Sequence, residues 1–158
     1  MDTEKRFNVR VYGLLIRNQS EILVTDEFRL GTLMMKFPGG GLEFGEGTID
    51  CLHREFTEEL RQEINVLSHF YTTDYYQPTQ LIPENQQLLS IYYLVEAIEP
   101  QMYITTELKF EIKEIDGEQS FRWVSIEDTA PEEFTFPIDQ KVFRMLQAQL
   151  DQKRINAG

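Results

Sequence analysis

Residues 40–59, GGLEFGEGTIDCLHREFTEE, bring five glutamates, one arginine and several glycines into a short segment. The glycines predict a loop, and the residues from Thr48 onward predict a helix. On that helix Glu55, Glu58 and Glu59 stand at i, i+3 and i+4, so their carboxylates share one face. Like charges at these spacings repel by roughly 0.2–0.5 kcal/mol per pair. Because carboxylate oxygens are preferred ligands of Mg²⁺ and Mn²⁺, the segment predicts a divalent-cation site.

A simpler interpretation of the same glutamates is a solvated acidic helix face, which most runs of charge turn out to be. That interpretation accounts for the acidic residues. It does not account for the glycines before the helix, for the fixed gaps between them, or for Arg54 among the glutamates.

The spacing resembles the signature of the Nudix hydrolases, called the Nudix box: Gly, five residues, Glu, seven residues, then Arg-Glu-apolar-any-Glu-Glu-any-Gly-apolar. The matching residues are Gly40, Glu46, Arg54, Glu55, Phe56, Glu58 and Glu59. Arg61 and Gln62 depart from it, because they stand where the family has glycine and an aliphatic residue. That glycine normally ends the helix in a left-handed cap. An arginine adopts this conformation at a cost of about 1–2 kcal/mol, so the helix is expected to run on or to end differently.

The resemblance implies roles for the matching residues. Glu55, Glu58 and Glu59 become metal ligands and catalytic residues, with one glutamate assisting deprotonation of a water molecule. Gly40 lets the backbone approach the metal or a phosphate closely, so it is included in the metal site. Arg54, also expected in the catalytic set, orients a box glutamate through a bidentate pair.

Family members often recruit a further glutamate from a loop that follows the box. Glu118 is the first choice for this catalytic and metal-binding role and Glu114 the second, because both precede a predicted strand at residues 121–124. A solvated acidic loop is the alternative for each. Tyr71, Tyr75 and Tyr76 are candidates for stacking on a nucleobase, with packing in the core as the alternative.

Composition limits the possible partners. The 158 residues, 41% hydrophobic and 12% aromatic, predict one globular domain over residues 1–158. A net charge of −12 argues against a nucleic-acid partner, since no basic stripe is present to neutralise phosphates. No stretch approaches 18 apolar residues and no signal-peptide pattern is present, so a cytoplasmic protein without a membrane partner is expected. The single cysteine, Cys51, excludes an intrachain disulfide and is expected to be buried.

Hydrophobic periodicity predicts the elements that position the acidic run. A hairpin is expected at residues 7–16 and 21–25, further strands at 32–37, 64–76, 88–97 and 121–124, and helices at 48–61 and 139–150. The polar residues 151–158 are expected to fray. This order agrees with an α+β fold, and the resemblance implies a Nudix-like α/β/α sandwich with a mixed β-sheet between helices.

The resemblance further implies Mg²⁺-dependent hydrolysis, with Mn²⁺ as a possible substitute, of a pyrophosphate bond in a small nucleotide. The expected substrate is a nucleoside diphosphate linked to another moiety, of the nucleotide-sugar or ADP-ribose type, or a nucleoside triphosphate. A homodimer is possible because dimers are common in the family. The alternative is a non-catalytic Nudix-fold nucleotide-binding or sensor module. The complete set of box glutamates favours the enzyme.

Overall fold

The computed structural model describes residues 3–157 of the 158, arranged in two compact units. The first unit comprises residues 1–14 and 38–103, and the second comprises residues 15–37 and 104–158. Strand β1 (Arg6–Arg17) begins in the first unit and ends in the second. The acidic run of residues 40–59 lies entirely within the first unit.

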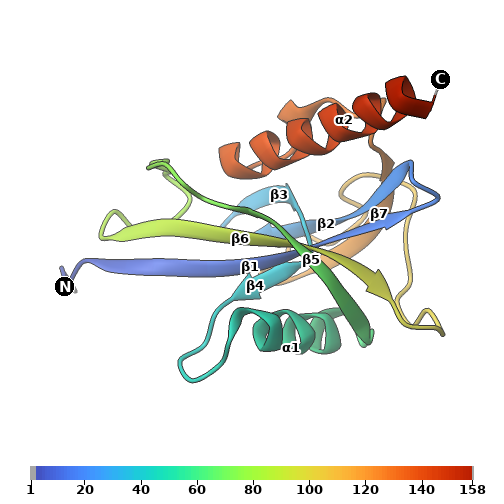
Figure 1. The fold of residues 1–158 in the computed structure, drawn as a ribbon. Helices are drawn as coiled ribbons and strands as arrows, with labels where there is room; N and C mark the ends of the chain where they lie inside the picture. Colours follow the sequence, from blue (N-terminus) through green and yellow to red (C-terminus); the bar gives the residue numbers. More distant parts are fainter. Residues whose placement is uncertain (1–2, 158) are drawn as a thin grey trace. The chain divides into compact units, whose positions relative to one another are not determined.

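The first unit combines β1 with strands β4 (Gly39–Gly41), β5 (Ile64–Thr72) and β6 (Gln86–Ala97) and with helix α1 (Thr48–Leu60). β5 pairs with β6 in antiparallel fashion, β6 lies beside β1, and β4 pairs antiparallel with β1. Helix α1 packs along one side of these strands (Figure 1). The strands thus form a platform that carries the helix with the acidic face.

Helix α1 is held on this platform by an apolar stripe at helical spacing. Leu52, Phe56 and Leu60 are buried, and their spacing matches the 3.6-residue period of a helix. Gly13 of β1 lies under Phe56, because a Cβ at position 13 would collide with the Phe56 ring. This contact between Gly13 and Phe56 sets the distance between α1 and β1.

The end of α1 corrects the expectation for Arg61. The helix stops at Leu60, and Arg61 adopts the left-handed conformation with φ 52° and ψ 30°. Its N–H donates to Thr57 O at 3.0 Å, and the N–H of Gln62 donates to Phe56 O at 3.2 Å. The arginine therefore makes the helix exit that glycine makes elsewhere.

Hydrogen bonds of the Gln62 side chain offset the cost of the left-handed conformation at Arg61. Its side chain is 1% exposed, and its Nε2 donates to Ile98 O at 2.7 Å and to Glu63 O at 2.8 Å. Its Oε1 accepts from the N–H of Met102 at 2.8 Å. A buried amide with satisfied donors and acceptor stabilises the chain where an aliphatic side chain would leave backbone groups without partners.

The second unit contains the end of β1, strands β2 (Glu21–Arg29), β3 (Thr32–Lys36) and β7 (Gln119–Ser125), a short 3₁₀ helix (Pro131–Glu133) and helix α2 (Pro137–Ala157). β2 pairs antiparallel with β1, β3 and β7, which confirms the predicted hairpin. Arg122 of β7 donates to buried Asp26 of β2 at 2.6 and 3.1 Å. Figure 1 shows α2 as the long red helix.

Several boundaries differ from the sequence-based expectations. The glycine segment is a strand, β4, because it pairs with β1. β5 ends at Thr72, four residues before the predicted limit of 76, and residues 73–85 form a loop. α2 begins at Pro137, a favoured first helical residue, and extends through Ala157, so residues 151–157 are helical; residue 158 lies outside the described residues. No helix in the described part of the chain is long and apolar enough to cross a membrane.

Replacing Gln62 tests the role of the buried amide. Gln62→Leu is expected to lower the free energy of unfolding by roughly 1–3 kcal/mol, because the Ile98 carbonyl and the Met102 N–H lose their partner in a buried position. Urea unfolding measures the change. The control is Gln87→Leu at an exposed position of β6. Equal stability of Gln62→Leu and wild type would show that the amide network contributes nothing.

Candidate active site

Gly40 and Glu55 define the centre of the candidate site. Gly40 lies opposite Val11 in the β1–β4 pairing, and a Cβ at position 40 would overlap the carboxyl group of Glu55. Glu55 is 9% exposed. The missing side chain at position 40 is therefore the space that the Glu55 carboxylate uses, and it brings that carboxylate against the backbone of β4.

Arg54 donates hydrogen bonds to the glutamates around this point. Its Nε donates to Glu46 Oε2 at 3.0 Å and its Nη2 to Glu46 Oε1 at 2.7 Å, which is the bidentate geometry expected of an arginine–carboxylate pair. Its Nη1 donates to Glu55 Oε1 at 3.0 Å and to Glu58 Oε2 at 3.2 Å. Nη2 also donates to the Gly41 carbonyl at 2.9 Å.

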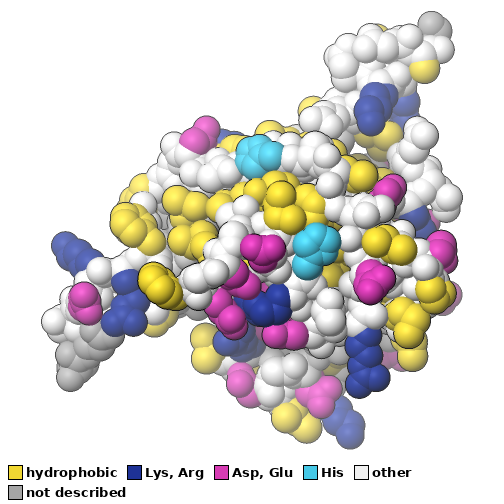
Figure 2. Space-filling model, turned by 60° about the horizontal axis from the view of Figure 1, so that its bottom comes forward, with side chains coloured by type: hydrophobic (Ala, Val, Ile, Leu, Met, Phe, Trp, Pro, Cys, Tyr) yellow, Lys and Arg dark blue, Asp and Glu magenta, His cyan; other side chains and the backbone are white. Residues whose placement is uncertain are grey.

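Figure 2 brings the side of the molecule with α1 forward and shows acidic side chains gathered around a basic one. This arrangement shifts the pKa values of Glu46 and Arg54. Hydrogen bonds from Arg54 and from the Glu43 backbone N–H lower the pKa of Glu46 to about 2, and the Glu46 carboxylate raises the pKa of Arg54. Both groups are therefore charged at neutral pH.

Cys51 lies under the same cluster. Its side chain is buried, with the thiol 3.5 Å from the Gly41 carbonyl. Burial, followed by the neighbouring Glu46 carboxylate, raises the pKa of the Cys51 thiol to about 12. Because the thiolate is the reactive form of cysteine, Cys51 serves packing, as the sequence predicts.

Polar contacts from neighbouring residues hold the first turn of α1. The N–H of Gly47 donates to Asp50 Oδ2 at 3.2 Å. The hydroxyl of Thr48 is 2.7 Å from that of Tyr93 on β6, and the His69 ring meets the Tyr93 ring edge-on with centroids 5.7 Å apart. Sequence reasoning missed Tyr93, because its contact with Thr48 links residues far apart in the chain.

The other glutamates predicted for the site are less buried than Glu55 or lie outside the first unit. Glu58 and Glu59 lie on α1 with Glu55, and the Glu58 side chain is 58% exposed. Glu118 and Glu114 are exposed residues of the second unit, in the segment before β7. The catalytic and metal-binding roles of all these residues stay predictions.

The donor set suits a hard divalent cation, since it consists of carboxylates beside a backbone strand without side chains. Two of these carboxylates, those of Glu55 and Glu58, accept hydrogen bonds from Arg54. No group of three or more His, Cys, Asp or Glu within residues 3–157 is arranged to hold an ion as it stands. A cation would be held by Glu55, Glu58 and Glu59. The exposed Glu58 side chain would turn from Arg54 toward the ion.

The pH dependence of stability tests the Arg54–Glu46 pair. A carboxylate whose pKa falls from 4.5 to about 2 on folding contributes stability above pH 4.5 and loses it as pH falls toward 2. Glu46→Gln should therefore be less stable than wild type at neutral pH, and the difference should shrink across that window in urea unfolding. In an Arg54→Ala background the same substitution should show a weaker pH dependence, because the hydrogen bond from the Glu43 N–H still lowers the pKa of Glu46. An unchanged difference would contradict the pairing.

Comparison with known proteins identifies the family of the chain. A family model described as NUDIX domain matches residues 6–146. The chain is similar to a NUDIX hydrolase structure from Nitrosomonas europaea, with 19% identity, a TM-score of 0.67, and coverage of 90% of this chain and 89% of that chain. Among curated proteins the chain has no match.

Two further structures agree. A MutT NUDIX hydrolase from Burkholderia pseudomallei has 14% identity, a TM-score of 0.66, and coverage of 87% of this chain and 96% of that chain. An ADP-ribose pyrophosphatase from Streptococcus suis has 12% identity, a TM-score of 0.58, and coverage of 93% and 92%. At these identities the structures establish the fold alone, which is the α+β Nudix fold with a mixed sheet that the sequence predicts. The family model covers most of the chain, and the chain therefore belongs to the Nudix family of pyrophosphohydrolases.

Proposed function

We propose that the protein is a Mg²⁺-dependent hydrolase that cleaves a pyrophosphate bond in a nucleoside diphosphate linked to another moiety, or in a nucleoside triphosphate. The observation that carries the proposal is the carboxylate of Glu55, set against Gly40 and joined through Arg54 to Glu58 and Glu46. Glu55, Glu58 and Glu59 are the proposed metal ligands. Glu118 is proposed as an additional ligand.

A bound Mg²⁺ ion would neutralise phosphate charge and lower the pKa of a coordinated water molecule. The residues of the chain then have separate tasks. One glutamate of the box accepts the proton of the attacking water, as a general base must lie within hydrogen-bond reach. The backbone of Gly40 and Gly41 would border the reacting phosphate beside the Glu55 carboxylate.

Arg54 is a positioning residue in this proposal. Its guanidinium already donates to three glutamates and to a backbone carbonyl, so it holds ligands in place and leaves substrate charge to other groups. The net charge of −12 favours a cation that neutralises a phosphate anion as it approaches this acidic surface.

The family and one similar structure support the proposed substrate class. The similar structure from Streptococcus suis is that of an ADP-ribose pyrophosphatase, which supports a nucleoside diphosphate joined to a second group. A panel of ADP-ribose, nucleotide sugars, dinucleoside polyphosphates, NADH and nucleoside triphosphates identifies the preferred member. Tight nucleotide binding without turnover across the panel would instead favour a sensor module.

Substitution of the proposed ligands tests the metal site. Glu58→Gln and Glu59→Gln are each expected to lower kcat/KM by more than about 100-fold, since losing a residue that only supports a ligand already costs roughly 10–100-fold. Glu63→Gln, at an exposed position just after the helix, should keep wild-type turnover. Activity that survives both ligand substitutions, or that persists in chelator, would rule out the proposed site.

A second test uses the space at position 40. Gly40→Ala places a Cβ where the Glu55 carboxyl lies, and displacement of a positioned group by about 1 Å costs on the order of 100-fold in rate. Gly41→Ala is the matched comparison, because a Cβ there comes no closer than 3.8 Å to Arg10. We expect Gly41→Ala to lose less kcat/KM than Gly40→Ala, with both variants folded by thermal melting. Equal losses would show that the contact with Glu55 is unimportant.

A further inference from the structure

The connection between β6 and β7 lacks the secondary structure that part of its sequence favours. It spans residues 98–118, all of them described, and contains no helix or strand; Figure 1 draws it as a loop. Loops longer than about 12–15 residues without secondary structure are uncommon in compact domains and usually have a function. Within this connection, residues 107–113 have the sequence ELKFEIK, in which charged and apolar side chains alternate strictly. Alternation with this period is the pattern of a β-strand.

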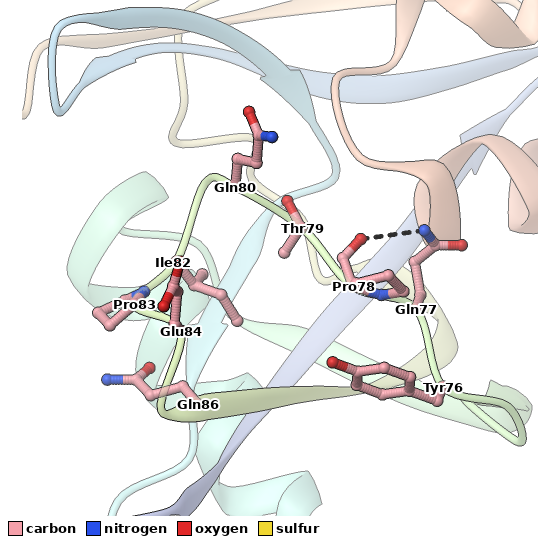
Figure 3. A pocket seen from close by; sticks show the side chains of 9 residues that line it. All are labelled: Tyr76, Gln77, Pro78, Thr79, Gln80, Ile82, Pro83, Glu84 and Gln86. Carbon is pink, nitrogen blue, oxygen red and sulfur yellow. Dashed lines mark hydrogen bonds between the residues drawn. The ribbon is translucent and has the colours of Figure 1, made fainter. Parts of the chain in front are cut away.

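The loop between β5 and β6, residues 73–85, provides a contrast. It includes Pro78 and Pro83, which cannot donate hydrogen bonds to a strand ladder. Figure 3 shows this loop folded back around a cavity of about 560 Å³, with Gln77 Nε2 donating to Pro78 O at 3.1 Å. Residues 107–113 contain neither proline nor glycine, so composition does not explain their irregular conformation.

Hydrogen bonds hold the two ends of this segment to the second unit, and its middle is exposed. Thr106 N–H donates to Phe121 O of β7 at 2.8 Å, and Gly117 N–H donates to Phe28 O of β2 at 2.9 Å. Between these two bonds the Leu108 side chain is 66% exposed, and all four charged residues of the segment are exposed. The segment is therefore accessible to another strand.

Phe110 interrupts the extended conformation that the alternation favours. It adopts a left-handed conformation with φ 56°, which costs energy in a residue with a side chain. Its N–H donates to Asp26 Oδ2 at 3.2 Å, and Asp26 also accepts hydrogen bonds from Arg122 at 2.6 and 3.1 Å. Asp26 therefore keeps a charged partner when Phe110 moves away, and an extended Phe110 is relieved of the left-handed conformation.

Residues 107–113 are complementary to a second copy of themselves. Antiparallel pairing centred on Phe110 sets each residue of one copy opposite a residue of the other. The opposed residues are Glu107 and Lys113, Leu108 and Ile112, Lys109 and Glu111, and Phe110 and Phe110. Every charge then faces the opposite charge, and every apolar side chain faces an apolar one. Such cross-strand pairs are the unit of stabilisation in antiparallel sheets.

Other registers of the same pairing are disfavoured by like charges. With the centre moved to Lys109, this lysine meets its own copy and Glu107 meets Glu111. With the centre moved to Glu111, this glutamate meets its own copy and Lys109 meets Lys113. Like charges directly opposite each other destabilise a strand pair. The sequence thus selects the register centred on Phe110.

The charge of the whole chain limits where two copies can meet. A net charge of −12 makes two copies repel each other. Residues 107–113 contain two glutamates and two lysines, so the segment itself has no net charge. A contact through this segment therefore adds little repulsion, and its own charge pairs are attractive.

We propose that residues 107–113 of two copies pair as antiparallel strands about a two-fold axis at Phe110 and so form a homodimer. The contact is isologous, because the same segment serves both copies, and it closes after two chains. The inference goes beyond the proposed function and does not depend on it.

Reversal of the charges in pairs tests the interface. One variant carries Glu107→Lys and Glu111→Lys, and the other carries Lys109→Glu and Lys113→Glu. Because each variant sets like charges opposite each other in its own dimer, self-association measured by sedimentation velocity should weaken about tenfold or more in each. An equimolar mixture of the two variants should recover the dimer, because every opposed pair is again opposite in charge.

The control separates the position of the charges from their number. Glu63→Lys with Glu84→Lys makes the same change in net charge at exposed positions of the first unit, and it should dimerise at least as well as wild type. Thermal melting verifies that each variant is folded. A wild-type chain that stays monomeric at its highest soluble concentration would overturn the proposal. So would variants that dimerise as wild type does, or a mixture that stays monomeric.

A cysteine on the two-fold axis tests the register. Directly opposed residues of an antiparallel pair have Cα atoms about 4.5–5.5 Å apart, within the range of a disulfide. Phe110→Cys should therefore form a covalent dimer with oxidised glutathione on a non-reducing gel, and the native Cys51 is buried. Leu108→Cys is the matched control, because the two copies of residue 108 lie about 13 Å apart along the strands. Equal cross-linking of the two variants would overturn the register.

Discussion

The candidate site depends on the single guanidinium of Arg54. Glu55, Glu58 and Glu46 bring three carboxylates to one end of β4, an arrangement whose mutual repulsion opposes folding. Arg54 donates to all three and also to the Gly41 carbonyl, so it joins helix α1 to the strand beside it. A lysine has no planar fork and makes no bidentate pair of this kind. The geometry of the site therefore follows from the arginine as much as from the glutamates.

In the first unit, the glutamates bound by Arg54 and the basic side chains of β1 lie on different faces of the sheet. On the side of α1, Arg54 is fully engaged with acidic residues, which leaves phosphate charge to a bound cation. On the other face of β1, the alternation of the strand places Arg6 and Arg10 with Asn8. Acidic ligands and basic side chains are thus kept apart by the strand itself.

Local patterns in the sequence were sufficient to predict the helix face with Glu55, Glu58 and Glu59, because a 3.6-residue period is a property of neighbouring residues. The β1–β2 hairpin followed from alternation for the same reason. The glycine strand was not predictable in this way, since its pairing with β1 depends on the register Val11↔Gly40. The roles of Tyr93 and of the buried pair Asp26–Arg122 also depend on contacts between distant segments.

The proposed additional metal ligand illustrates a different limit of prediction from sequence. The prediction for Glu118 and Glu114 depends on their order before a predicted strand, and order alone does not fix a position in space. The structure places both on exposed positions of the second unit. The box glutamates, by contrast, are positioned by a helix and by Arg54.

The departure of this chain from the family pattern at Arg61 and Gln62 shows how one helix exit can be stabilised in two ways. Glycine followed by an aliphatic residue ends the helix without backbone strain and fills an apolar space. Here the left-handed arginine costs about 1–2 kcal/mol, and Gln62 links the end of α1 to Ile98 and Met102 after β6. These bonds, like those of Arg54 at the glycine strand, fix the helix through hydrogen bonds to backbone groups. Because Glu58 and Glu59 lie in the last turn of α1, the direction of their carboxylates depends on this exit.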